Sequence, residues 1–257
     1  MIKSTAPHAT IPMQTIGPIK LAGPVIEGEI TVPMATYETP LWPSTNRGAR
    51  VSMQSGGINV VIVDERMSRS VLAEASDAET AVRVKNSLQS RRADIERISQ
   101  GTSRFAQFLN VNFQIVANLI YIRLEMKTGD ASGHNMITKA ADAVLSWVLQ
   151  EYPELTYVSV SGNFCTDKKV SAVNGILGRG KNVVAEITIP GKICRRYLKT
   201  TPEKVVDLNI KKNLVGSIVA GGLRTANAHF ANMLLGLAML AGLTHSVILY
   251  RAGAINA

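Results

Sequence analysis

The sequence predicts an α+β fold, and three stretches of residues carry that prediction. From Leu119 to Met126 apolar and polar side chains alternate, which is the pattern of a β-strand. Apolar residues then recur at helical spacing from Ile137 to Val148, and residues 156–160 read as a second strand. With 257 residues, 46% of them apolar, the chain can bury a large core as one big domain or as two smaller ones.

The segments before this strand–loop–helix–strand unit are less regular. Residues 15–63 are broken by glycines and prolines into what we expect to be short extended segments. The run Ser76-Asp77-Ala78-Glu79 resembles a capping box and predicts a helix that continues toward Leu88. In the strand 119–126 the charged residues Arg123 and Glu125 lie opposite the apolar face, so we expect this strand to be half-buried.

Two loops of the unit are candidate binding sites. Residues 128–135 form a glycine-punctuated loop before a helix, where backbone N–H groups and the helix dipole favour a phosphate; the alternative is an ordinary tight turn. After the second strand, residues 161–169 end in Lys168 and Lys169. These lysines either bind an oxyanion or carboxylate or form a solvated charge run.

The segment from Gly175 to Lys181 has the GxxxxGK spacing of a phosphate-binding loop, yet we interpret it as a turn. Asn182 stands where such a loop needs Ser or Thr for magnesium, and the preceding residues are too polar for a buried strand. Val183 likewise replaces the last glycine of a GxGxxG pattern. We therefore expect a turn before a strand over residues 183–189, and no ATP site.

Charge and composition restrict the classes of function. The net charge of +9 favours anionic partners, but basic pairs are scattered and aromatic residues are only 5%, so nucleic-acid binding is disfavoured. Two cysteines and four scattered histidines argue against a disulfide framework and a metal site. Residues 1–18 contain no apolar stretch of the kind a signal peptide needs, so we expect none there. The apolar run 230–243 is too short to span a bilayer, so we expect it to be a buried core helix.

Seven separated stretches of the chain form a recognisable set: Pro33–Glu38, Ser44–Gly48, Met67–Arg69, Gly129–Met136, Val160–Lys169, Asn209–Ser217 and Asn227–Asn232. Together these stretches resemble the 3-hydroxy-3-methylglutaryl-CoA (HMG-CoA) reductase family. They follow the family's order over roughly residues 15–243, which makes the combined signal specific.

The resemblance implies a large CoA-binding domain, residues 1–70 and 160–257, with an inserted NAD(P)-binding α/β domain, residues 71–159. It also implies reduction of HMG-CoA to mevalonate and CoA by two molecules of NADPH, or of NADH. The basic charge suits these anionic ligands. We expect a cytoplasmic homodimer or larger assembly that binds neither membrane nor nucleic acid.

The resemblance also implies roles for individual residues. Lys168 matches the cation near the carbonyl oxygen, where negative charge grows, and Glu38 matches the acid that protonates the alkoxide. The residues matching the acyl and CoA side are Arg69, Ser161, Lys212, Asn232, Ser44, Asn46 and Arg47. The residues matching the cofactor loop are Asp130, Ala131, Ser132, Gly133 and Asn135, whereas His134 replaces an apolar residue common in the family.

The chain departs from the family near its end. Thr244 stands where the family has an aspartate that tunes the catalytic acid, and the family's late histidine has no match up to Ala257. We therefore expect a C-terminally truncated copy, in which the large domain is incomplete and activity is low. The alternatives are a non-catalytic NAD(P)- or CoA-binding remnant and a basic interaction or nucleic-acid-binding protein.

Overall fold

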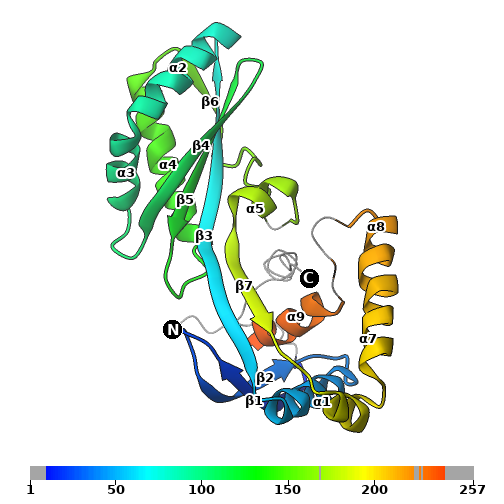
Figure 1. Ribbon diagram of the computed structural model, residues 1–257. Helices are drawn as coiled ribbons and strands as arrows, with labels where there is room; N and C mark the ends of the chain where they lie inside the picture. The colour runs from blue at the N-terminus through cyan, green and yellow to red at the C-terminus, as the bar shows by residue number, and fades with distance from the viewer. Residues whose placement is uncertain (1–9, 168, 223–225, 227, 241–257) are drawn as a thin grey trace. The chain divides into compact units, whose positions relative to one another are not determined.

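The computed structural model describes residues 10–167, 169–222, 226 and 228–240 (Figure 1). It confirms the predicted mixture of helices and sheet, divided into two compact units. The first unit comprises the chain up to Val63 and from Val183 onward, and the second unit is Asp64–Asn182. The expected insert, 71–159, lies within the second unit; its assignment as a nucleotide-binding domain stays a prediction.

The first unit begins with two strands and a helix around a small core. Strand β1 (Met13–Ala22) pairs antiparallel with β2 (Gly28–Ala35) and parallel with the start of β3 (Ile58–Ala75). The helix α1 (Leu41–Gln54) packs on β1. The core cluster consists of Ile16, Met34, Leu41, Trp42 and Ala49.

Helix α1 corrects the expectation that residues 15–63 are all extended. Pro40, one of the prolines that suggested a break, is the residue just before the helix, and Pro43 lies in the first helical turn, where a proline displaces no intrahelical hydrogen bond. The indole of Trp42 donates a hydrogen bond to the carbonyl of Met34 at 2.9 Å, which ties the start of the helix to the end of β2.

The rest of the first unit is mostly helical. Strand β7 (Gly180–Glu186) pairs with β3, and short helices follow before the apolar helix α9, which packs on β2. These elements are α6 (Gly191–Ile193), η1 (Cys194–Leu198), α7 (Pro202–Leu208), η2 (Asn209–Val215), α8 (Gly216–Val219) and α9 (Phe230–Leu240). Strand β7 therefore begins earlier than the expected residue 183.

Helix α9 confirms the predicted helix from Phe230, but the expected full burial is wrong for the side chains that the structure describes. Residues 230–235 are half-buried and Leu237 is 43% exposed. Close contact is confined to the face toward β2, where a Cβ on Gly236 would lie 2.6 Å from Cγ of Met34. Residues 241–243 of the expected helix lie outside the described residues.

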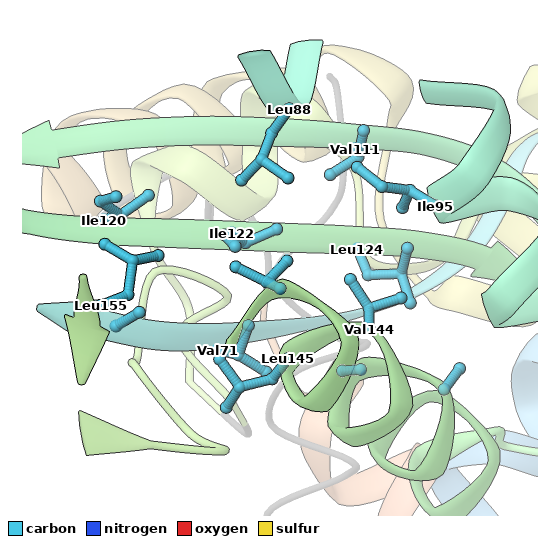
Figure 2. Packing of buried hydrophobic residues seen from close by; sticks show 14 of the residues in the cluster. Val71, Leu88, Ile95, Val111, Ile120, Ile122, Leu124, Val144, Leu145 and Leu155 are labelled. Atoms are coloured by element: carbon cyan, nitrogen blue, oxygen red, sulfur yellow. The ribbon is translucent and has the colours of Figure 1, made fainter. Parts of the chain in front are cut away.

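In the second unit, α2 (Ala78–Ser90), α3 (Arg92–Gln100) and α4 (His134–Glu151) cover one face of an antiparallel sheet (Figure 1). The strand order is β4–β5–β3–β6, with β4 at Gln107–Val116, β5 at Leu119–Lys127 and β6 at Leu155–Ser159. The predicted strand–loop–helix–strand unit is therefore confirmed as β5–α4–β6. Figure 2 shows its core, in which Ile122 and Leu124 of β5 meet Val144 and Leu145 of α4.

Strand β5 corrects the expectation of a half-buried strand, because both of its charged residues are fully buried. Arg123 and Glu125 are 0% exposed and form an ion pair with each other. Arg123 also donates to the side chain of Asn174 and, at 2.7 Å, to the carbonyl of Gly178. The second face of β5 is thus covered by the helix α5 (Ala172–Leu177) and the turn after it.

The predicted helix toward Leu88 is confirmed, but its N-cap is Asp77 and not Ser76. The carboxylate of Asp77 accepts a hydrogen bond from the backbone N–H of Thr80 at 2.7 Å, and this bond lowers the pKa of Asp77. The expected turn over residues 175–181 is also partly wrong, since residues 175–177 belong to α5. Ser171 caps that helix by accepting from the N–H of Asn174, which gives this short polar run a stable start.

Candidate active site

The loop before α4 is built on two glycines in the left-handed conformation. Gly129 has φ +60° and Gly133 has φ +82°. At Gly133 a Cβ would lie 2.5 Å from the side chain of Thr128, whose hydroxyl donates to the carbonyl of Ala131 at 3.0 Å. No side chain caps the first turn of the 18-residue helix α4, so its N–H groups remain available to an anion.

A polar cavity of about 150 Å³ lies at this end of α4, within the second unit. His134 and Asn135 enter it from the first turn of the helix, whereas Arg69 enters it from β3 and Asp167 from the loop after β6. The full lining is Ser68, Arg69, His134, Asn135, Ile137, Thr138, Asp167 and Arg179. The structure therefore brings one predicted cofactor residue, Asn135, and one predicted acyl-binding residue, Arg69, to the same cavity.

Among the described residues that line this cavity, Asp167 is the one carboxylate, and two arginines hold it. Arg69 Nη1 lies 3.2 Å from Oδ2 of Asp167, and Arg179 donates to Oδ1. Nε2 of His134 lies 4.0 Å from Oδ1, and its Nδ1 lies 3.5 Å from the Ser132 hydroxyl. Because two guanidinium groups face one carboxylate, the lining keeps an excess positive charge that suits an anionic ligand.

Lys168, the predicted oxyanion-binding cation, lies outside the described residues, but the chain on either side of it is well held. Asn174 donates to the carbonyl of Thr166 at 3.2 Å and to that of Lys169 at 3.4 Å. Ser161 lies earlier in the same loop, where its N–H donates to the hydroxyl of Ser159. Thr244, which stands where the family has the aspartate that tunes the catalytic acid, also lies outside the described residues.

In the first unit the structure brings together Glu38 and Asn232, which the sequence assigned separately. The Asn232 side-chain amide, on α9, donates to Oε2 of Glu38 at 3.1 Å, although the residues are 194 positions apart. Glu38 precedes α1, and its backbone N–H donates a hydrogen bond to the hydroxyl oxygen of Thr36 at 2.9 Å. An exposed carboxyl held by an amide donor can reach a ligand and exchange a proton with it.

A second cavity, of about 490 Å³, lies in the first unit between α1 and the segment around η1. Four cationic side chains line it, and none of the four forms a salt bridge within the described part of the chain. The lining residues are Pro43, Asn46, Arg47, Arg50, Arg196, Tyr197 and Lys199. Such a cluster is chemically suited to phosphate groups.

The remaining predicted residues of the first unit are placed as follows. Asn46 both lines this cavity and accepts a hydrogen bond from the N–H of Gly17 at 3.1 Å, so it also has a structural role. Ser44 is exposed on α1. Lys212 is exposed on η2 and lines a separate, mostly apolar cavity of about 350 Å³.

Two further findings concern the described residues only. No group of three or more histidine, cysteine or acidic side chains there could hold a metal ion, and Cys165 and Cys194 are both buried and free. Within the same ranges, every helix is too short or too polar to cross a bilayer.

Comparisons with known proteins place these motifs in one family. A model of the family hydroxymethylglutaryl-coenzyme A reductase matches residues 1–242. The chain belongs to this family. It is 41% identical over 224 residues to the 3-hydroxy-3-methylglutaryl-coenzyme A reductase of Pyrococcus horikoshii, covering 87% of this chain and 54% of that protein. With the reductase of Strongylocentrotus purpuratus it shares 40% identity over 237 residues, 91% of this chain and 25% of that protein.

Solved hydroxymethylglutaryl-CoA reductases share the fold. One from Streptococcus pneumoniae superposes with a TM-score of 0.73 at 14% identity, over 98% of this chain and 64% of that one. A class II reductase from the same organism, described as bound to NADPH, gives a TM-score of 0.71 at 14% identity, with the same coverage. The chain thus spans about half the length of the archaeal relatives and about two thirds of these structures.

The sequence did not identify several of the residues that line these cavities in this member of the hydroxymethylglutaryl-CoA reductase family. Arg50, Arg196 and Lys199 join Arg47 only through the fold, because 145 or more residues separate the two segments. Arg179 was set aside as part of a turn. Asp167 was noted only as the residue before two lysines, and its pairing with Arg69 and Arg179 depends on the fold.

Proposed function

We propose that this chain is the part of an HMG-CoA reductase that binds NAD(P)H and the CoA thioester, and that it serves the reduction of HMG-CoA to mevalonate and CoA. The observation that carries the proposal is the cavity of the second unit, where Asn135 of the cofactor loop and Arg69 of the acyl motif line one space. The relatives named as reductases at about 40% identity support it.

The residues around α4 fit a reduced dinucleotide. The uncapped first turn of α4 offers N–H groups to a phosphate, and the left-handed Gly133 lets the backbone pass close to Thr128. When bound, a reduced nicotinamide supplies hydride to a carbonyl carbon. We propose NADPH or NADH as the cofactor, held by Asp130–Asn135.

We assign the stabilisation of charge and the transfer of protons to side chains of this chain. We assign to Lys168 the stabilisation of the oxyanion that grows as hydride arrives, because an ammonium group is a compact cation. We assign to Glu38 the protonation of the alkoxide; the amide of Asn232, 3.1 Å away, holds that carboxyl in place. Arg69 and Lys212 offer cations to the free carboxylate of the acyl group.

We assign the cavity of the first unit to the phosphate groups of CoA. Four cations with no acidic residue in the lining suit a ligand whose charge is concentrated in phosphates. Asn46 and Arg47 were expected on the substrate side, and Arg50, Arg196 and Lys199 extend that assignment.

Ligand binding to the 257-residue chain tests the two sites separately. We expect NADPH and CoA to bind with measurable heat in titration calorimetry, and ATP with magnesium not to bind. Arg47→Ala and Arg50→Ala should weaken CoA tenfold or more, the loss of about 1.4 kcal/mol for a phosphate contact. Lys192→Ala, an exposed lysine of the same unit outside the cavity, is the matched control. Equal losses in all three variants would contradict the CoA assignment.

Turnover tests the reaction itself, with oxidation of NADPH followed in the presence of HMG-CoA and, separately, of mevaldehyde. Lys168→Met and Glu38→Gln should lower the rate by about 10²–10⁴-fold, whereas Lys85→Met, at a half-buried position of α2 that lines neither cavity, should leave it unchanged. Ligand binding without any turnover would favour the alternative of a non-catalytic remnant. Binding of nucleic acid but of neither ligand would refute the reductase proposal.

A further inference from the structure

The turn Gly178-Arg179-Gly180 resembled a phosphate-binding loop, but its glycines serve a different geometry. Both are left-handed, with φ +84° and φ +85°. A Cβ on Gly178 would lie 2.6 Å from Oδ2 of Asp64 and 2.9 Å from Nε of Arg66, so the backbone packs directly on side chains of β3. The turn thereby carries the Arg179 side chain into the interior of the second unit, where it is 1% exposed.

Arg179 connects strand β3 to the loop that carries the lysines. One terminal nitrogen donates to the carbonyl of Ser68 and lies 3.1 Å from its hydroxyl, while the other donates to Oδ1 of Asp167. The side chain of Asp167 is 20% exposed and faces the cavity, whereas the guanidinium of Arg179 that contacts it is buried. The planar fork of arginine can make both sets of bonds at once, which a lysine cannot.

Behind Arg179 lies a second buried ion pair that shares Ser68. Arg123 lies 3.2 Å from the Ser68 hydroxyl and pairs with Glu125, which also accepts from Arg66 at 2.8 Å and from Asn112 at 3.0 Å. These partners satisfy the buried carboxylate and fix the arginine that holds Ser68. A continuous polar network thus runs from Glu125 through Ser68 and Arg179 to Asp167.

Arg69, the second arginine that contacts Asp167, lies in a different environment from Arg179. Arg69 is more exposed than Arg179, and its Nε is buried without a hydrogen-bond partner among the described residues. Among the described residues, Arg69 and Arg179 are the two arginines that contact Asp167. The buried Arg179 can therefore hold Asp167 by itself, which leaves the more exposed Arg69 available to an anionic ligand.

We propose that Arg179 is a positioning residue: it anchors Asp167, and with it residues 163–167 of the loop after β6, to β3, so that these residues keep their place when Arg69 engages the substrate. The importance of this loop for turnover rests on the function proposed above, whereas the anchor itself does not. This role also accounts for the two glycines of the turn Gly178-Arg179-Gly180, whose spacing resembled that of a phosphate-binding loop.

Thiol labelling tests the anchor without any ligand. Cys165 is fully buried in the anchored loop, and Cys194 is buried in the first unit. We expect Arg179→Gln to speed maleimide labelling of Cys165 at least tenfold, measured by mass spectrometry of its peptide, with Cys194 unchanged. Arg179→Lys, which keeps the charge and provides a second variant that should fold, should give an intermediate rate. Arg97→Gln, at an exposed arginine of the same unit, should leave both rates unchanged.

Kinetics of mevaldehyde reduction then separate positioning from general stability. We expect kcat to fall about 10–100-fold in Arg179→Gln, with the Kd for NADPH unchanged and partial recovery in Arg179→Lys. Faster labelling together with this kcat loss supports the proposal. Faster labelling of Cys165 alone, when even the unaltered chain shows no turnover, supports the anchor and favours the non-catalytic remnant over the proposed function. Unchanged labelling of Cys165, or equal acceleration at both cysteines, overturns the proposal.

Discussion

Replacing Gly133 by alanine should disturb the candidate cofactor loop by two separable effects. The left-handed conformation, φ +82°, costs an alanine about 1 kcal/mol relative to glycine. The new methyl group would also lie 2.5 Å from Cγ2 and Oγ1 of Thr128, well inside van der Waals contact, and relieving such overpacking costs about 1–3 kcal/mol more. We therefore expect Gly133→Ala to lower the free energy of unfolding by about 2–4 kcal/mol.

Gly129 supplies the matched control, because it has φ +60° in the same loop and a Cβ there would meet nothing within 4 Å. Gly129→Ala should lose only the conformational cost of about 1 kcal/mol. Urea unfolding followed by circular dichroism measures both losses, and titration with NADPH measures the effect on the loop. Adding Thr128→Ala should return part of the loss in Gly133→Ala. Equal losses for the two glycine variants, or no recovery, would refute the role of the Thr128 contact.

Three further outcomes are expected. Asp77→Ala should lower the free energy of unfolding at neutral pH. Because the pKa of Asp77 is lowered in the folded state, this loss should be present above the unfolded value of about 3.8 and should shrink as the pH falls below it. Urea titrations at several pH values measure the loss, and a loss that does not depend on pH would contradict the capping hydrogen bond. Ile122→Ala in the core should lower the free energy of unfolding by about 2–5 kcal/mol, whereas Val206→Ala, at an exposed position of α7, should change it by no more than about 0.5 kcal/mol. Similar losses in the two variants would contradict the burial of Ile122 and the exposure of Val206. Sedimentation at micromolar concentration should show a homodimer or larger species, and a clean monomer would overturn that expectation.

The sequence predicted the elements whose signals are local. Alternation in β5 and helical spacing in α4 depend only on neighbouring residues, so these elements were placed almost to their ends. Helix α1 was missed because its polar run and Pro43 resemble a broken segment, and its burial depends on β1 and β2. Arg123 and Glu125 were placed on the right side of the strand but in the wrong environment, since α5 covers them from 50 residues away.

The same limit applies to the candidate site. Residues within one motif, such as Asp130–Asn135, could be assigned together from their spacing and their resemblance to the family. The cluster of Arg47, Arg50, Arg196 and Lys199 could not, because no pattern in either segment indicates that α1 and η1 are neighbours. Arg179 was hidden by a glycine spacing that suggested a different chemistry.

The unequal cores of the two units mean that the chain has no single melting temperature. The core of the second unit draws on three helices and four strands, whereas the core cluster among the described residues of the first unit comprises five buried residues. We expect two unfolding transitions, the first unit opening before the second. Each unit carries one of the two tryptophans: Trp42 is buried in the first, and Trp147 lies under the guanidinium of Arg91 in the second. Intrinsic fluorescence of single-tryptophan variants can therefore follow each transition by itself, and a ligand's effect should be read at the transition of the unit that binds it.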